Sequence, residues 1–297
     1  MRLVTYNIQY GRGKDDRVDL ERIARAVAGA DVIALQEVER YWPHSGMVDQ
    51  AAELSVLLPA HYWVYGAIFD MDASLEDENG GIQNRRRQFG PMLMSRLPIV
   101  WSRTHLFPKL ATDSHFHMDT GAVEGLIETK GGPLRCYSLH LSHLNSRERL
   151  LQLDFLLAQH RRALVNGPPW GGPPVTGGET GWDAGARAPQ TTSEACLLGD
   201  FNSETGSPEY ELLVGPKDAT GARVHHVDGF VDTWAAAHRE EDGEVTWIRP
   251  PYYQDLPDRR LDYCFVSPSL ASHVTNAWVD TDAQGSDHQP YWVELDI

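Results

Sequence analysis

The sequence has few cysteines, no excess of positive charge and no long apolar run. Its 297 residues include three cysteines, Cys136, Cys196 and Cys264, each inside a strand-like run. An odd count without a Cys-x-x-Cys pair argues against a disulfide framework or a zinc knuckle and predicts buried free thiols. The N-terminal stretch MRLVTYNIQY has no apolar signal core, and no apolar run approaches 18 residues. We therefore expect a soluble, cytoplasmic protein without a membrane anchor.

The charge balance is acidic. Lys and Arg total 26 against 42 Asp and Glu, which gives a formal net charge of −16. Proteins that bind nucleic acid through its phosphates usually carry a basic surface, so a nucleic-acid partner is not favoured. The net charge does not reveal a local basic patch or a bound divalent metal ion, so the nucleic-acid alternative stays open. Nothing in the sequence indicates an obligate protein partner.

Strand-like and helical segments follow one another irregularly. The helix predicted over 146–165 has a clear N-terminal signal, because Asn145 followed by Glu148 is typical of an N-cap. Irregular interspersion of many strands with few helices predicts an α+β sandwich rather than a doubly wound parallel sheet. Strands are expected at 2–8, 32–37, 62–68, 90–94, 98–106, 121–129, 133–141, 194–199, 244–248, 261–267, 274–280 and 290–296, with further helices at 19–29, 48–58, 207–214 and 229–237.

Residues 166–189 interrupt this pattern, since half of them are Gly or Pro. Such a composition predicts a surface insertion. Strand-like runs with related polar endings lie on both sides of it, so we expect one domain over 1–297 that carries an insertion, not two domains and a linker.

Polar side chains stand at the ends or beginnings of several apolar runs. Each has a local explanation, because Asp and Asn favour turns and a histidine can be satisfied inside a core. Together they form one set of polar residues at the edge of the predicted strand framework, which is where catalytic groups commonly lie. The set consists of Asn7, Glu37, His140, Asp200, Asn202, Asp262, Asp287 and His288.

This set suits metal-assisted chemistry on phosphorus. Carboxylate and amide oxygens such as those of Glu37, Asp287 and Asn7 are preferred by Mg²⁺ or Mn²⁺ over zinc, and one or two ions are compatible with the set. In-line attack on a phosphate needs a positioned water, neutralisation of the developing charge and help for the leaving oxygen. An Asp can activate the water, an amide can hold a phosphate oxygen, and a histidine beside a carboxylate is favoured as a cation.

The order of motifs resembles that of a known family. TYNI, LQE, FGPMLMSRLPI, SLHL followed by Arg149 and Gln152, GDFN, RRLDY and SDH occur in sequence along the chain. In this the chain resembles the endonuclease/exonuclease/phosphatase superfamily, which includes DNase I-like nucleases, repair enzymes, sphingomyelinases and inositol polyphosphate 5-phosphatases. The resemblance runs from Met1 to the C-terminus. It implies a four-layer αββα sandwich with two packed, mainly antiparallel sheets flanked by helices.

The resemblance also implies roles for the matching positions. Glu37 would be the principal metal ligand, with Asn7 and Asp287 completing its neighbourhood. Asp200 would activate the attacking water, while Asn202 and His140 would hold and stabilise the phosphate. Asp262 would pair with His288 and favour its protonated form. The resemblance therefore implies a catalytic role for His140, Asp200, Asn202, Asp262 and His288. It implies a metal-binding role for Asn7, Glu37 and Asp287.

Three further loops bear on substrate choice. The FGPMLMSR run is preceded by Arg85, Arg86 and Arg87. These arginines are candidates for binding a second phosphate or an anionic headgroup, and the alternative is that they belong to a solvated loop. Tyr252 and Tyr253 are candidates for contact with a leaving group, or surface residues. His115 and His117, at alternate spacing, are candidate auxiliary ligands.

These observations predict hydrolysis of a phosphoester, with a small or medium phosphodiester such as a nucleotide or headgroup ester favoured. A lipid headgroup diester belongs to the same class and is not separable from it by sequence. The alternative is a DNA or RNA nuclease, and a further alternative is a relative that binds without catalysis.

Overall fold

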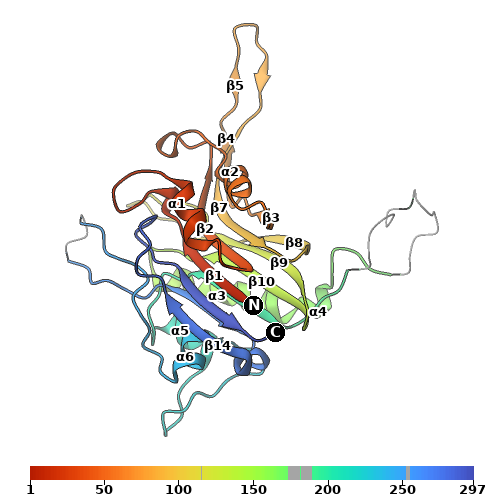
Figure 1. Ribbon diagram of the computed structural model, residues 1–297, viewed down its shortest axis with the longest axis vertical. Helices are drawn as coiled ribbons and strands as arrows, with labels where there is room; N and C mark the ends of the chain where they lie inside the picture. Colours follow the sequence, from red (N-terminus) through yellow and green to blue (C-terminus); the bar gives the residue numbers. More distant parts are fainter. Residues whose placement is uncertain (115, 173–180, 182–188, 252–254) are drawn as a thin grey trace.

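Two β-sheets pack face to face in this computed structural model, which describes residues 1–114, 116–172, 181, 189–251 and 255–297 (Figure 1). The first sheet has the strand order β14-β15-β1-β2-β7-β3, with β4 paired to β7. Its strands are β1 (Arg2–Asn7), β2 (Val32–Arg40), β3 (Tyr62–Tyr65), β4 (Phe69–Asp72), β7 (Arg86–Ser95), β14 (Val274–Val279) and β15 (Tyr291–Leu295).

The second sheet has the order β12-β13-β11-β10-β9-β8. Two pairs are parallel, β1 with β2 and β10 with β11, and the other strand pairs within the described residues are antiparallel. The predicted mainly antiparallel arrangement is therefore confirmed. The strands of this sheet are β8 (Ile99–Leu106), β9 (Gly121–Thr129), β10 (Gly132–His140), β11 (Ala195–Asp200), β12 (Val231–Asp232) and β13 (Asp262–Val266).

Helices cover the outer face of each sheet. The helices are α1 (Leu20–Val27), α2 (Gln50–Leu57), α3 (Ser146–Arg161), α4 (Ala163–Asn166), α5 (Pro208–Val214) and α6 (Thr233–His238), and short 3-10 turns are η1 (Gln9–Gly11), η2 (Pro43–Ser45) and η4 (Pro268–His273). Asp19 caps α1 by accepting from the Arg22 N–H, and Asn145 caps α3 by accepting from the Glu148 N–H, as its sequence predicts. The helix expected over 146–165 ends at Arg161, because Arg162 leaves the helical conformation and separates α3 from α4.

Three apolar clusters bind these layers together. The inner cluster joins both sheets, with side chains such as Leu93 and Leu198 fully buried between them. A second cluster packs α1 and α2 against the first sheet, and a third packs α3 and α5 against the second. Each buried Leu or Ile contributes roughly 1.5–3 kcal/mol of burial free energy, so both faces of each sheet are stabilised. The result is the DNase I-like αββα sandwich.

Two stretches differ from the sequence-based expectation. Residues 244–248 do not form a strand; Trp247 makes only isolated bridges to Arg259 and His288. The strand expected over 62–68 stops at Tyr65, and the chain pairs with β7 again as β4. Residues 69–90 are therefore no simple loop: beyond β4 the chain forms the hairpin β5 (Leu75–Glu76) and β6 (Ile82–Gln83), which stands away from the body of the molecule (Figure 1).

The three cysteines are buried and free, as predicted. They lie on β10, β11 and β13 in the core between the sheets. None of the helices in the described ranges is both long and apolar enough to cross a membrane. Most of the predicted insertion at 166–189 lies outside the described residues.

Candidate active site

One row of the second sheet carries three of the candidate residues. His140, at the end of β10, is the register partner of Asp200 at the end of the parallel strand β11. Asp200 is in turn the partner of Asp262, which begins the antiparallel strand β13. The backbone ladder thus places an imidazole and two carboxylates side by side at one edge of the sheet, because residues directly opposite each other share a face.

The first sheet contributes Asn7 and Glu37. Asn7 Nδ2 donates to Glu37 Oε1 at 3.1 Å and to Asp200 Oδ2 at 3.0 Å, so one amide connects the two sheets. Glu37 lies at a bulge, since the pairing of β2 with β7 shifts between Leu35 and Val38. Its φ of 60° is in the left-handed region, which is unfavourable for a side chain with a Cβ and is typical of functional positions.

A buried polar chain beside Glu37 joins the sheets a second time. Thr5 Oγ1 donates to Gln36 Oε1 at 3.2 Å, and Gln36 Nε2 donates to Ser138 Oγ at 3.0 Å. The Ser138 hydroxyl donates to the Leu35 carbonyl at 2.9 Å. All of these groups are buried, so losing any one partner would leave an unsatisfied polar atom in the core.

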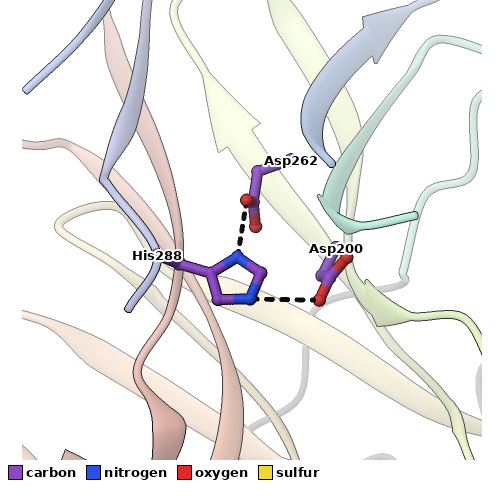
Figure 2. Close-up of side chains that lie close together, drawn as sticks. All are labelled: Asp200, Asp262 and His288. Carbon is purple, nitrogen blue, oxygen red and sulfur yellow. Dashed lines mark hydrogen bonds and ion pairs between the residues drawn. The ribbon is translucent and has the colours of Figure 1, made fainter. Parts of the chain in front are cut away.

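The ring of His288 lies between two carboxylates (Figure 2). Its Nδ1 is 2.7 Å from Asp262 Oδ2, and its Nε2 is 3.7 Å from Asp200 Oδ2. Burial lowers the pKa of His288, but the two carboxylates outweigh burial and raise the pKa to about 10. Burial also raises the pKa of both Asp200 and Asp262, an effect that the His288 cation opposes. His288 is therefore an imidazolium at neutral pH.

His140 and Asn202 form the other side of the same cluster. The His140 Nε2 atom lies 3.4 Å from Asp200 Oδ2 and 3.1 Å from Asn202 Nδ2. Burial lowers the pKa of His140 to about 3, and the neighbouring His143 and His288 add to the effect, so the ring is neutral. Asn202 also donates from Nδ2 to the Leu141 carbonyl at 2.9 Å, which orients its amide.

The turn after β11 has a local as well as a functional explanation. The Asn202 N–H donates to Asp200 Oδ1 at 2.8 Å, and Asn202 has a φ of 49°, as Asn tolerates in turns. One oxygen of Asp200 therefore closes the turn. Its other oxygen faces Asn7, His140 and His288.

Asp287 is held by two neighbours. Trp247 Nε1 donates to Asp287 Oδ2 at 3.1 Å, and Ser286 Oγ donates to Oδ1 at 3.3 Å. Trp247 escaped the sequence reasoning because the run EVTWI has the alternation of a strand. No pattern in a single sequence indicates that the Trp247 indole N–H lies beside Asp287 of the SDH motif.

The donor set fits a hard divalent cation. Burial raises the pKa of Glu37 to about 7, and the nearby Asp287 raises it further while the Asn7 hydrogen bond lowers it. Carboxylate oxygens are ligands that Mg²⁺ or Mn²⁺ prefers. Asn7 presents its NH₂ to the carboxylates and its Oδ1 accepts from the Gln9 N–H at 3.0 Å, so its ligation of a metal stays a prediction.

A second set of donors is close enough to hold an ion. One ligand atom each from Asp200, Asp262 and His288 lie within 4.8 Å of one another. The His288 imidazolium already supplies a positive charge between these two carboxylates. That Glu37 and Asp287 hold the metal stays a prediction.

Two cavities adjoin these groups. The smaller, of about 230 Å³, contains Glu37 and His140 in its wall. The larger, of about 660 Å³, contains Asp287 together with Arg12 and Lys14. Sequence reasoning did not single out Tyr10, Trp42, His44, Phe89 and His143, which also line the smaller cavity.

The remaining candidates are placed differently. Arg85 and Arg87 pack on aromatic rings, whereas Arg86 forms an ion pair with Asp70. The Nε2 atom of His117 lies 2.7 Å from Glu148 Oε1, so this ring has a buried carboxylate partner. His115, Tyr252 and Tyr253 lie outside the described residues.

Comparison with known proteins agrees with this fold. A model described as the Endonuclease/Exonuclease/phosphatase family matches residues 4–288. The chain belongs to that family. Among curated protein sequences, none matches this chain. Members of the family are hydrolytic phosphoesterases that generally use a divalent metal, and they include phosphatases and nucleases.

Solved structures of endonuclease/exonuclease/phosphatase proteins share the fold. One from Beutenbergia cavernae DSM 12333 is 22% identical, with a TM-score of 0.62 and coverage of 99% of this chain and 71% of that chain. The mannosyl-6-phosphatase of Bacteroides thetaiotaomicron VPI-5482 is 18% identical, with a TM-score of 0.59 and full coverage of both chains, 100% and 100%. A humanized D. rerio TDP2 is 17% identical, with a TM-score of 0.58 and coverage of 100% and 99%. At these identities the likeness concerns the fold.

Proposed function

We propose that the protein is a divalent-metal-dependent phosphodiesterase that hydrolyses a small or medium phosphodiester by in-line attack of a water molecule. The observation that carries this proposal is the environment of Asp200 Oδ2. Asn7 donates to this oxygen at 3.0 Å, and His140 and His288 approach it at 3.4 and 3.7 Å. A carboxylate oxygen at the centre of polar groups from both sheets is positioned to bind and deprotonate a water.

The neighbouring side chains have complementary tasks. The second N–H of Asn202 Nδ2 and the Nε2–H of the neutral His140 ring would hold non-bridging oxygens of the phosphate. The His288 imidazolium would stabilise negative charge as it develops, because a preorganised cation in a buried site costs no reorganisation. Asp262 keeps this imidazolium protonated and oriented through the 2.7 Å contact with Nδ1.

Glu37 and Asp287 would hold the metal ion. When bound, Mg²⁺ or Mn²⁺ polarises a phosphate oxygen as a Lewis acid. Asn7 would orient Glu37 toward the ion through its 3.1 Å hydrogen bond, and Trp247 would orient Asp287. Both supports act on ligand carboxylates, as second-layer groups do in metal sites.

The two cavities favour a diester over a monoester. Glu37 lines one of them and Asp287 lines the other, so a phosphate bound between these two carboxylates would have a cavity for each ester arm. A monoester would occupy only one. The volumes of about 230 and 660 Å³ suit groups of nucleoside or headgroup size.

The test compares bis-p-nitrophenyl phosphate with p-nitrophenyl phosphate in the presence of Mg²⁺ or Mn²⁺. We expect metal-dependent release of p-nitrophenolate, faster from the diester and lost in Asp200→Ala. Asp228→Ala removes an exposed carboxylate that pairs with Arg161 and serves as the matched control. Absence of metal-dependent turnover from both esters, or an Asp200→Ala rate equal to wild type, would refute the proposal.

Plasmid and single-stranded DNA or RNA, at low salt, test the nuclease alternative. The net charge of −16 argues against it, because duplex binding relies on neutralising phosphates. Cleavage of nucleic acid more efficient than that of the small diester would replace the proposed substrate class while leaving the chemistry unchanged.

A further inference from the structure

Three consecutive arginines at the base of the projecting hairpin are used in two different ways. Arg85 and Arg87 lie on aromatic rings, whereas Arg86, the first residue of β7, pairs with carboxylates. Arg86 is exposed, and its Nε is 2.8 Å from Asp70 Oδ1, with Asp72 at 4.0 Å from Nη1. Carboxylates of the neighbouring strand β4 thus neutralise Arg86.

Arg85 and Arg87 instead lie on aromatic rings. The Arg85 guanidinium is 5.3 Å from the centre of the Tyr41 ring, and that of Arg87 is 5.6 Å from the centre of the Trp42 ring. Arg87 Nε also donates to the Tyr41 carbonyl at 3.4 Å. Within the described part of the chain, neither guanidinium forms an ion pair with a carboxylate.

This arrangement orients two guanidinium cations without pairing either of them with a carboxylate. A ring face orients a guanidinium and restricts its freedom, while most of its N–H groups stay available to an anion. Both side chains are half-buried, whereas Arg86 is exposed. In a chain of net charge −16, two adjacent arginines with unbalanced charge are a local exception.

Trp42 connects this pair to the candidate active site. Its ring lies 5.4 Å from the ring of His44 and lines the same cavity as Glu37 and His140. Phe69, on β4, also packs against Trp42, with ring centres 5.3 Å apart. The Arg87 guanidinium is therefore separated from the cavity by one aromatic side chain.

We propose that Arg85 and Arg87 form a second phosphate-binding site, so that the substrate carries another phosphate group next to the one that is hydrolysed. This inference rests on the proposed function, because the first phosphate is placed by it. Each guanidinium would donate a pair of N–H groups to the second phosphate, and Trp42 would contact the sugar or ring between the two phosphates. A nucleoside bisphosphate and a short single-stranded oligonucleotide share this chemistry.

Binding, not turnover, tests the site. Adenosine 3′,5′-bisphosphate and adenosine 5′-monophosphate differ by one phosphate and are titrated by calorimetry into the full chain with Mg²⁺, in an Asp200→Asn background that prevents hydrolysis. We expect the bisphosphate to bind about 10-fold more tightly, the gain of charge-assisted hydrogen bonds. The double variant Arg85→Gln with Arg87→Gln should lose this preference.

Arg86→Gln is the matched control and should retain the full preference. Arg85→Lys with Arg87→Lys keeps the charges but loses the planar fork, and should retain part of it. Thermal unfolding followed by circular dichroism verifies that each variant is folded. A preference absent from the parent protein, surviving the double Gln variant, or lost equally in Arg86→Gln would overturn the proposal.

Two further arms separate the remaining questions. Titration with a thymidine trinucleotide distinguishes the sources: tighter binding than the bisphosphate, with the same dependence on Arg85 and Arg87, assigns the site to single-stranded nucleic acid, and weaker binding assigns it to a small molecule. Turnover of bis-p-nitrophenyl phosphate, a substrate with no second phosphate, by the wild-type protein tests the proposed function alone, so its failure is distinguishable from the loss of the bisphosphate preference.

Discussion

Asp200 and Asp262 lie opposite each other on β11 and β13, and the ring of His288 lies between their carboxylates (Figure 2). The cation is closer to Asp262, at 2.7 Å, than to Asp200, at 3.7 Å. Asp262 is fully buried and has the shorter contact, so it serves as the fixed counter-ion. Asp200 keeps a longer contact with the His288 ring.

Replacing Asp200 by Asn should lower kcat for bis-p-nitrophenyl phosphate about 10²- to 10⁴-fold, because an amide cannot accept the proton of the attacking water. KM should change little, since the phosphate is held by other side chains. Initial rates over a range of substrate concentrations measure both constants. Asp228→Asn should match the wild-type rates, and a fall in kcat of less than about 10-fold in Asp200→Asn would contradict the role of Asp200 as base.

Replacing Glu37 by Gln should raise the Mn²⁺ concentration needed for half-maximal activity by about 10-fold or more, because one anionic ligand is lost. Calorimetric titration with Mn²⁺ gives the affinity independently of turnover. The control is Glu53→Gln, on the exposed side of α2. Equal Mn²⁺ affinity in wild type and Glu37→Gln would exclude Glu37 as a ligand.

The buried pair Asp232 and Arg260 should matter for stability. Arg260 Nη1 and Nη2 each lie 2.9 Å from an oxygen of Asp232, and both side chains are almost fully buried. Asp232→Asn leaves the guanidinium without its counter-ion and should cost about 3–5 kcal/mol of unfolding free energy, measured with urea. Asp228→Asn breaks a half-exposed ion pair with Arg161 and should cost about 1 kcal/mol or less. Similar costs for the two variants would contradict this reasoning.

Acid should destabilise the protein partly through His160, at the end of α3. Burial lowers the pKa of His160 to about 4, and Arg135, 3.4 Å from its Nδ1, lowers it further while Glu124 opposes the shift. The unfolded chain, with a pKa near 6.5, binds the proton more readily, so this contribution is present above about pH 6.5 and is lost as pH falls through about 4.

The expected contribution is about 3 kcal/mol across that range. Urea unfolding at several pH values measures it as the difference in slope between wild type and His160→Gln. The variant should lose stability less steeply below pH 6.5, because its amide does not titrate. Parallel curves for the two proteins would show that the His160 ring does not stay neutral in the folded state.

The sequence indicates the candidate residues better than it indicates their neighbours. His140, Asp200 and Asp262 are recognisable because each interrupts an apolar run. Their placement in one row depends on the register of β10, β11 and β13, which is fixed by contacts between segments 60 residues apart in the chain. No short-range pattern contains that register.

The errors have physical causes. Residues 244–248 alternate like a strand, but Thr246 Oγ1 accepts from the Leu261 and Asp262 N–H groups, and Trp247 donates to Asp287. Backbone hydrogen bonds to Arg259, Asp287 and Gln289 are present as well, but they form isolated bridges and not a continuous strand ladder. The left-handed backbone of Glu37 is also not predictable from the sequence, because a glutamate between apolar residues suggests ordinary extended structure.

The hydrogen-bonded chain of Thr5, Gln36 and Ser138 limits how the protein can change during evolution. Half of the candidate site comes from each sheet, and this chain prevents the sheets from sliding past each other without exposing unmatched polar atoms. Catalytic geometry is therefore insulated from the surface. Loops and hairpins such as β5–β6 lie outside this chain of hydrogen bonds, so their length and charge can change while the candidate site residues keep their places.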